Sequence, residues 1–563
     1  MDYDLAIRGG TIVDGSGQPG FRGDLAIRDG VIAALGDAPG RAAETLDASG
    51  RVVAPGFVDI HTHYDAQVLW DRMLTISPWH GVTTVVMGNC GFGVAPTRPS
   101  HRGLILRTLE KVEGMSLSVL EAGLGEQWPF ETFPEYLDAV EARGTAIHVA
   151  ALVGHTPVRL YVMGEEATER AATAAEIAQM RAIVAEALAS GAVGFATSKS
   201  PTHMGWEGRP VPSRASELDE VRALAGTLGD AQRGLMQATV GPGLFMNEFA
   251  AIAGETRRPV SWTALLSGAM GPGSHRKLLE RAAQQQQEGF EVVPQVSCRP
   301  LNFEFQWKEP FPFESMAVFR RISAADFDAK MRAFADPAFR REFRESADSG
   351  MGPALSRWWE RTWVASCPTD PSLEERPLAE VARERGGHPS DVALDLGLES
   401  KLEARLRVAI MNYDESEVAE LLNAPHTVLG LSDAGAHASQ LCDACFSTHL
   451  LGHWVREKKV LGLEQAVRML TSRPAEVFGL LDRGRLAVGR PADAVVFDPE
   501  RVAASPLRRV RDLPAAGDRL VSEAIGIDAV IVNGVSIRRG NADAVDPEGP
   551  LPGRVLRNGC ASS

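Results

Sequence analysis

Hydrophobic residues are distributed differently at the two ends of the chain and in its middle. The first 50 residues alternate short β-rich runs with glycine-containing turns, as in DLAIRGGTIVDGSG, which is typical of a small layer of strands. The same pattern returns near the other end, in GRLAVGRPADAVVFDPE and IDAVIVNGVSIRRGN. We therefore expect residues 1–54 plus 484–563 to form one small β-sandwich domain that the middle of the chain interrupts.

The middle, residues 55–483, alternates apolar strand-like runs with segments of helical periodicity. This alternation is typical of repeated βα units that build a parallel sheet, and eight such units close into a barrel. The predicted fold class is thus α/β, a (β/α)8 TIM-like barrel with a small β-sandwich domain built from both chain ends. The eight predicted strands are 56–63, 81–89, 146–155, 191–199, 233–241, 258–267, 290–297 and 426–435.

Two connections between these strands are informative. Between the third and fourth strands, TAAEIAQMRAIVAEALASG keeps apolar residues at helical spacing and ends on glycine, which predicts a helix with a glycine C-cap. The seventh and eighth strands are about 130 residues apart, too far for an ordinary βα connection. We expect an insertion at about 298–395 over the barrel mouth, rich in Phe and Trp, which is either a packed accessory subdomain or a substrate lid.

Composition and charge narrow the class of protein. The chain has 563 residues, of which 44% are hydrophobic and 23% charged, as expected for a globular protein of more than one domain. Its net charge is -15 and it has no block rich in Lys and Arg. Nucleic acid is therefore not an expected partner, because nucleic-acid binding depends on positive charge.

Targeting signals and cysteine usage point to a compartment. The stretch MDYDLAIRGGTIVDGSG lacks a basic region followed by an apolar one, and no window reaches the roughly 18 to 20 apolar residues of a membrane span. The six cysteines are too scattered for a disulfide framework and fit reduced thiols better. We expect a soluble, cytoplasmic protein without membrane contact.

The first predicted strand ends in two histidines, within GFVDIHTHYDAQ. Because a strand sends alternate side chains to opposite faces, His61 and His63 point the same way, about 7 Å apart along the chain. They could be hydrogen-bonded core histidines. Their position at the end of a barrel strand, bracketed by Asp59 and Asp65, favours a pair of metal ligands instead.

Three segments together carry a family resemblance. These segments are APGFVDIHTHYDAQ, SPWHGVTTVVMGNCGFGVAP and GLSDAG ahead of GRPADAVVFD. In them the chain resembles the amidohydrolase superfamily and, within it, the D-aminoacylase (N-acyl-D-amino-acid deacylase) family. The resemblance covers nearly the whole chain and is strongest in residues 50–98 and 426–500. It implies that His61 and His63 bind zinc, that Cys90 is a metal ligand, and that Asp433 is both a ligand and the catalytic base.

The residues themselves agree with the roles that the resemblance implies for Cys90 and Asp433. Cys90 lies just past the second strand, where a thiolate could join a metal held by the histidines, although a lone cysteine is more often a packing residue. Asp433 ends the apolar run TVLGLSD, where a carboxylate could exchange a proton with water at the metal. The alternative for Asp433 is a cap on the following loop.

The sequence departs from the family at two strands. The resemblance implies two further histidine ligands, but Ala264 and Val293 occupy the positions that we align with them. His275 falls too late, at the start of the following helix, and is not counted. The expected cofactor is Zn²⁺ as one or two divalent ions, and the number of ions stays open.

Other polar residues have weaker cases. Lys199 ends the fourth strand, where many superfamily members carry a carboxylated lysine that bridges two metals. A plain cation that binds a substrate carboxylate is the favoured alternative. His155 ends the third strand and could hydrogen-bond substrate or support a ligand, and His203 is a weaker candidate in a loop. We treat Cys442 and Cys445, in a predicted helix after the eighth strand, as packing residues.

The sequence thus predicts a metal-dependent hydrolase of C–N (amide) bonds, an N-acyl-(D-)amino-acid deacylase with a small-molecule amide substrate and Asp433 as general base and acid. Two alternatives remain. One is a hydrolase of a cyclic or other non-peptide amide with a reshaped metal site, and the other is a non-catalytic ligand-binding relative. The acyl group, the preference for D or L substrates and a homo-oligomeric state stay open.

Overall fold

A parallel barrel forms the centre of the protein. The computed structural model describes residues 1–314, 316–348 and 356–561. Its eight-stranded sheet has the order β16-β12-β11-β10-β9-β8-β7-β6, and a parallel bridge between Thr62 and Ala434 joins the two ends of this order. The predicted (β/α)8 barrel is confirmed. The barrel strands are β6 (Phe57–Asp59), β7 (Val82–Met87), β8 (His148–Gly154), β9 (Gly194–Ser198), β10 (Leu235–Thr239), β11 (Val260–Thr263), β12 (Val292–Val296) and β16 (Val428–Leu429).

The barrel strands form where the sequence is continuously apolar. Strand β8 reads HVAALVG and every one of its residues is buried, as expected for a parallel strand covered on both faces. The helix predicted before β9 is α5 (Ala174–Ser190), which starts with a capping box between Thr173 and Glu176 and ends at Gly191 in the left-handed region. Each end therefore satisfies backbone groups that the helix itself leaves unpaired.

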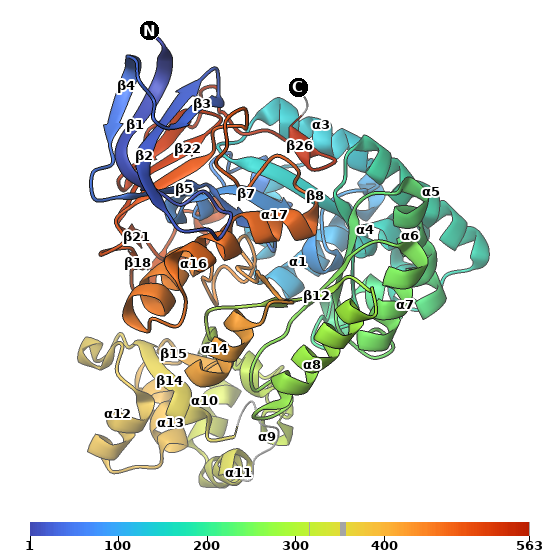
Figure 1. Cartoon of the computed structure of the whole chain (residues 1–563). Helices are drawn as coiled ribbons and strands as arrows, with labels where there is room; N and C mark the ends of the chain where they lie inside the picture. Colours follow the sequence, from blue (N-terminus) through green and yellow to red (C-terminus); the bar gives the residue numbers. More distant parts are fainter. Residues whose placement is uncertain (315, 349–355, 562–563) are drawn as a thin grey trace.

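Helices and short turns surround the barrel strands (Figure 1). They are α1 (Arg102–Glu113), α2 (Leu117–Leu124), α3 (Phe133–Arg143), α4 (His155–Met163), α5 (Ala174–Ser190), α6 (Leu218–Ala231), α7 (Met246–Thr256), α8 (Ser274–Gln287), α14 (Glu415–Asn423), α15 (Phe446–His449), α16 (Leu463–Leu470) and α17 (Ser472–Phe478). None of the helices in the described part of the chain is both long enough and apolar enough to cross a membrane.

A second sheet combines the two ends of the chain. Its order is β24-β23-β22-β17-β5-β1-β2-β3, with β4 paired to β1. Strands β5 and β17 pair antiparallel, with Val53 opposite Val496, so the blue and orange-red strands in Figure 1 lie together. The strands are β1 (Tyr3–Ile12), β2 (Phe21–Arg28), β3 (Val31–Gly36), β4 (Ala42–Asp47), β5 (Val52–Pro55), β17 (Ala494–Phe497), β22 (Ile527–Val532), β23 (Val535–Arg539) and β24 (Ala542–Asp543).

Buried charges link this second sheet to the barrel. Asp493, just before β17, lies 3.1 Å from Nε2 of His148 at the start of β8. It also forms a 2.8 Å ion pair with Arg483 and accepts a 2.8 Å hydrogen bond from the backbone N–H of Asn533.

Three two-stranded sheets lie in the C-terminal part of the chain. They pair β18 (Ala503–Ala504) with β21 (Ala524–Ile525), β19 (Arg508–Val510) with β20 (Arg519–Val521), and β25 (Leu556–Arg557) with β26 (Cys560–Ala561).

The segment between β12 and β16 contains a unit with its own hydrophobic core, drawn in yellow in Figure 1. Strands β13, β15 and β14 form its sheet in that order, so the unit extends to Met411, past the end expected near residue 395. The backbone N–H of Glu304 donates a 2.8 Å bond to Gln440 in the loop after β16. Its elements are β13 (Leu301–Gln306), α9 (Ala317–Arg320), α10 (Phe327–Ala335), α11 (Pro337–Asp348), β14 (Thr362–Ser366), α12 (Leu378–Arg385), α13 (Pro389–Glu399) and β15 (Arg405–Met411).

Candidate metal centre

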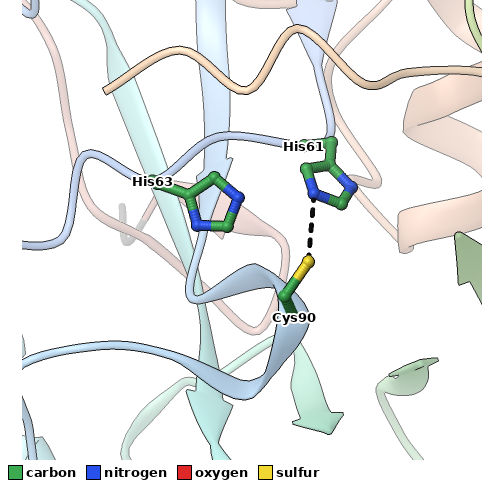
Figure 2. A group of neighbouring side chains, drawn as sticks. All are labelled: His61, His63 and Cys90. Atoms are coloured by element: carbon green, nitrogen blue, oxygen red, sulfur yellow. Dashed lines mark hydrogen bonds between the residues drawn. The ribbon is translucent and has the colours of Figure 1, made fainter. Parts of the chain in front are cut away.

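Two histidines and a cysteine meet at the carboxyl ends of the first two barrel strands (Figure 2). His61 and His63 follow β6, and their ring centroids are 5.3 Å apart. Candidate ligand atoms of His61, His63 and Cys90 all lie within 4.8 Å of one another, and the three residues are buried. The structure therefore brings together three of the residues predicted to bind metal.

The loop after β7 aims the Cys90 thiol at this cluster. Cys90 has φ 56, and Gly88 before it has φ 84. A side chain at Gly88 would collide with the carbonyl oxygen of Leu152, so the tight GNCG turn requires glycine there. The backbone N–H of Cys90 donates a 2.7 Å bond to Oε1 of Gln237, and its Sγ lies 3.4 Å from Nε2 of His61.

Asp433 joins the cluster from the eighth strand. Its backbone N–H donates a 3.1 Å bond to the carbonyl of His61, which fixes the loop after β16 against the end of the first strand. The carboxylate Oδ1 lies 3.3 Å from Nε2 of His61 and 3.8 Å from Nε2 of His63. The Asp433 carboxylate and the Cys90 thiol therefore both approach Nε2 of His61, and the carboxylate also approaches Nε2 of His63.

Gln295 and Glu113 lie beside the Nδ1 atoms of the two imidazole rings. Nδ1 of His61 is hydrogen-bonded at 2.8 Å to Oε1 of Gln295 on β12, so Nε2 of that ring is free to act as a ligand. Nδ1 of His63 lies 3.2 Å from Oε1 of Glu113 at the end of α1, a charge contact without hydrogen-bond geometry. Sequence reasoning missed both supports. Gln295 did leave a signal, as the polar residue in the apolar run VVPQV.

The charges in the cluster favour the ligand forms of the thiol and the carboxylate. Burial acts to raise the pKa of Cys90, but the charges and hydrogen bonds of His61 and His63 outweigh it and lower that pKa to about 7. Burial also acts to raise the pKa of Asp433, yet the same two histidines hold it well below its usual range. Both groups are thus easily deprotonated, as metal binding requires.

The donor set fits a divalent transition metal. Two imidazole nitrogens and a thiolate are ligand types that zinc prefers, and three protein donors leave a position for water, as in catalytic zinc sites. His61, His63 and Cys90 are respectively 1%, 8% and 7% exposed, so the donors are shielded from bulk water. The residues present therefore fit a zinc centre held by His61, His63 and Cys90, with the Asp433 carboxylate beside it.

The positions expected to carry further histidines lie elsewhere. Val293 is buried in an apolar cluster that includes Val58 and Val428, and Ala264 directly follows β11. His275 is at the start of α8, as expected, and its Nε2 lies 3.0 Å from Glu420. None of these three residues belongs to the cluster of His61, His63 and Cys90.

Lys199 is held by the backbone. Its ammonium donates to the carbonyl oxygens of Ser216 and, at 3.2 Å, of Arg214. Burial lowers the pKa of Lys199 to about 8. Because a carboxylated lysine would place negative charge against these carbonyl oxygens, the contacts suit an ammonium group and not a bridging ligand.

The other candidate histidines have partners of their own. His155 is fully buried, with Nδ1 2.8 Å from Thr197 Oγ1 and Nε2 2.8 Å from Glu220 Oε1. Both its ring nitrogens are therefore occupied within the fold. His203 pairs through Nδ1 with Ser198 Oγ at 2.7 Å, and its ring centroid lies 5.1 Å from that of Phe92.

The placement of Cys442 and Cys445 in a helix was wrong. Helix α15 begins only at Phe446, and Cys445 is its N-cap. Both thiols are buried, and Sγ of Cys445 lies 3.4 Å from the carbonyl oxygen of Cys442. Both cysteines therefore lie buried in the loop between β16 and α15.

Comparisons with known proteins agree with the barrel fold. Residues 44–538 match the family described as Amidohydrolase family. D-aminoacylase of Alcaligenes xylosoxydans xylosoxydans is 32% identical over 563 residues, which are 98% of this chain and 97% of that protein. The crystal structure of N-acyl-D-glutamate deacylase from Bordetella bronchiseptica with zinc and a phosphonate inhibitor has a TM-score of 0.65 at 29% identity, covering 99% of each chain.

A further solved structure concerns the binuclear metal center of D-aminoacylase. It matches with a TM-score of 0.66 and 27% identity, covering 98% of this chain and 100% of that one. A (β/α)8 barrel with imidazole, thiol and carboxylate donors at its strand ends defines a barrel enzyme with a metal centre. This chain belongs to the amidohydrolase family, and the resemblance to D-aminoacylases is confirmed.

Proposed function

We propose that this protein is a metal-dependent hydrolase of amide bonds that removes the acyl group from N-acyl-D-amino acids. One observation carries the proposal: His61, His63, Cys90 and Asp433 converge at the carboxyl ends of three barrel strands. In a (β/α)8 barrel this face carries the active site. The choice of N-acyl-D-amino acids rests on the D-aminoacylase and N-acyl-D-glutamate deacylase relatives.

The side chains of the site have different roles, namely binding the metal and orienting the residues that bind it. A bound divalent ion would supply Lewis-acid chemistry, by polarising the acyl carbonyl and by acidifying water. His61, His63 and Cys90 would hold the ion, and Gln295 and Glu113 would fix the two rings. Burial of these donors limits competing water and strengthens the electrostatic interactions among them.

Asp433 is the residue suited to proton transfer. Its carboxylate is 21% exposed, more than the side chains of His61 and His63, so it lies on the open side of the cluster. As a carboxylate it can accept a proton at Oδ1 or Oδ2 when water attacks the acyl carbon. It can then return that proton to the leaving nitrogen, which completes hydrolysis to a carboxylic acid and an amine.

The charge and the cysteines of the chain bear on its partners and its location, and the charge is consistent with a small-molecule substrate. The chain carries a net charge of -15, which disfavours nucleic acid as a partner. All six cysteines are free, and free thiols suit a reducing compartment, so we infer a cytoplasmic location. A homo-oligomeric state remains a prediction.

The proposal is tested with purified, zinc-loaded protein and a panel of N-acyl-amino acids in D and L forms. Released amine is measured for neutral, acidic and basic side chains, and a cyclic amide is included. We expect turnover of N-acyl-D-amino acids that a chelator abolishes. Turnover of the cyclic amide alone would identify the protein as a hydrolase of cyclic amides. No turnover of any compound by metal-loaded protein would support a ligand-binding relative without catalytic activity.

A further inference from the structure

We infer that the metal centre holds one divalent ion and not two, because β10, β11 and β12 present hydrogen-bonded amides and hydroxyls where a second ion would need ligands. This inference rests on the proposed function and deepens it. The relevant contrast is the binuclear metal center of D-aminoacylase. The strands in question read LMQAT, VSWT and VVPQV, and they contain no His, Cys, Asp or Glu.

On β10 the polar residue beside the centre is Gln237, which is fully buried. Its Oε1 accepts a 2.7 Å bond from the backbone N–H of Cys90, and its Nε2 lies 3.5 Å from Oγ1 of Thr263. Both ends of the amide therefore have partners. Because a neutral amide oxygen is a weak ligand for zinc beside imidazole and thiolate, Gln237 serves to hold the Cys90 turn.

On β11 and β12 the same arrangement repeats. Gln295 accepts from Nδ1 of His61 at 2.8 Å and donates through Nε2 to Oγ of Ser261 at 3.1 Å. Gln295 and Ser261 are both fully buried. The amide of Gln295 thus bonds to Nδ1 of a ligating histidine, and as a neutral, hydrogen-bonded group it is a weak ligand for zinc beside imidazole and thiolate.

Cys298 after β12 and Lys199 after β9 are two further candidate ligands, and both are engaged elsewhere. Cys298, two residues after β12, places Sγ 3.4 Å from the carbonyl oxygen of Phe446, and burial raises its pKa. Lys199 donates to the carbonyls of Arg214 and Ser216. Within the described residues, His61, His63 and Cys90 form the one group of three or more His, Cys, Asp or Glu side chains whose ligand atoms lie close enough to share an ion.

These contacts have a chemical consequence for Cys90. A thiolate can bridge two ions only if each ion has other ligands on its own side. Here the donors that contact one another are His61, His63, Cys90 and Asp433, whereas Gln237 of β10 and Gln295 of β12, which contact Cys90 and His61, are neutral and already hydrogen-bonded. Cys90 would therefore serve as a ligand of one ion.

The experiment is a metal count on the full-length protein. Protein is stripped with chelator, reloaded with excess zinc, freed of unbound metal by gel filtration, and analysed by mass spectrometry for zinc per chain. We expect a ratio of about 1, as for a mononuclear catalytic zinc site. A ratio of two overturns the inference and leaves the proposed function standing, whereas protein that retains no zinc overturns both.

A second readout does not depend on stoichiometry alone. After reloading with excess Cu²⁺ and gel filtration, the electron paramagnetic resonance spectrum should integrate to one isolated spin per chain. A spin-coupled or silent pair would overturn the inference. Cys298→Ser and Lys199→Arg serve as controls, since each removes a group that a second ion would need. The zinc ratio should be unchanged in both variants, and a fall in either shows that the donor set assigned here is wrong.

Discussion

The carboxylate of Glu113 lies 3.2 Å from Nδ1 of His63. Glu113 is the last residue of helix α1, and its backbone carbonyl also accepts a hydrogen bond from the N–H of His437 in the loop after Asp433. One residue therefore supports a ligand from the first barrel strand and the loop that follows the eighth. Carboxylate partners of this kind raise the basicity of a ligating imidazole and fix its ring.

Replacing Glu113 should weaken metal binding. Loss of an outer-shell group that supports a ligating histidine typically costs about 10 to 100-fold in metal affinity. We expect Glu113→Ala to show a loss in this range, measured by zinc competition with a fluorescent chelator. Glu113→Gln keeps an acceptor and should lose less. An affinity in Glu113→Ala equal to that of the wild type would mean that this contact does not orient His63.

Asp433→Asn should abolish turnover while the fold and the metal remain. The amide is nearly isosteric, but it cannot accept a proton at neutral pH, and loss of a general base costs about 10² to 10⁴ in rate. Amine release, a melting curve and zinc analysis on one preparation check this. Activity close to wild type would remove Asp433 from proton transfer, and loss of zinc would show that its carboxylate is mainly a ligand.

Removal of the metal should inactivate the enzyme reversibly. Because the positions aligned with two further histidine ligands are Ala264 and Val293, we expect dialysis against a chelator to remove activity and added zinc to restore it. Magnesium should not restore activity, since imidazole and thiolate donors suit zinc and oxygen donors suit magnesium. Full activity after prolonged chelation would indicate ligands beyond those assigned here.

Asp493 should stabilise the protein in a pH-dependent way. Burial acts to raise the pKa of Asp493, but His148 and Arg483 outweigh it and hold that pKa below its usual range. Its contribution is therefore fully present above the ordinary aspartate pKa of about 3.9 and is lost as the pH falls below that value. We expect Asp493→Asn to lose about 3 kcal/mol at pH 7, since it breaks a buried ion pair.

Denaturant unfolding of the wild type and of Asp493→Asn at pH 7, 4 and 3 tests this expectation. The difference between the two proteins should be largest at pH 7 and should shrink at the lower values. Asp528→Asn is a control, because Asp528 pairs with Arg51 while its side chain is 39% exposed, and exposed pairs contribute little. A difference that does not change with pH would assign the role of Asp493 to hydrogen bonding.

The sequence predicts the barrel well because its strands are buried on both faces and read as apolar runs. Strand alternation predicts that His61 and His63 point the same way, and their rings do lie together, although β6 ends at Asp59 and both histidines follow it. Glu113 could not be found this way, since it reaches His63 from a helix end whose position depends on how loops pack. On β12 the sequence alignment pointed to Val293, but Val293 packs in an apolar cluster, and the residue that contacts His61 is Gln295, two positions later.

Strands β5 and β17 are neighbours in the sheet built from both chain ends, but β5 ends at Pro55 and β17 begins at Ala494. During synthesis, the first strands leave the ribosome long before their partners exist. At about 5 to 20 residues per second, the edge of β5 waits roughly 20 to 90 seconds for β17. Throughout that interval its backbone groups form an exposed, apolar strand edge of the kind that pairs with other chains. Overexpression at reduced temperature with chaperones should therefore improve the yield of folded protein.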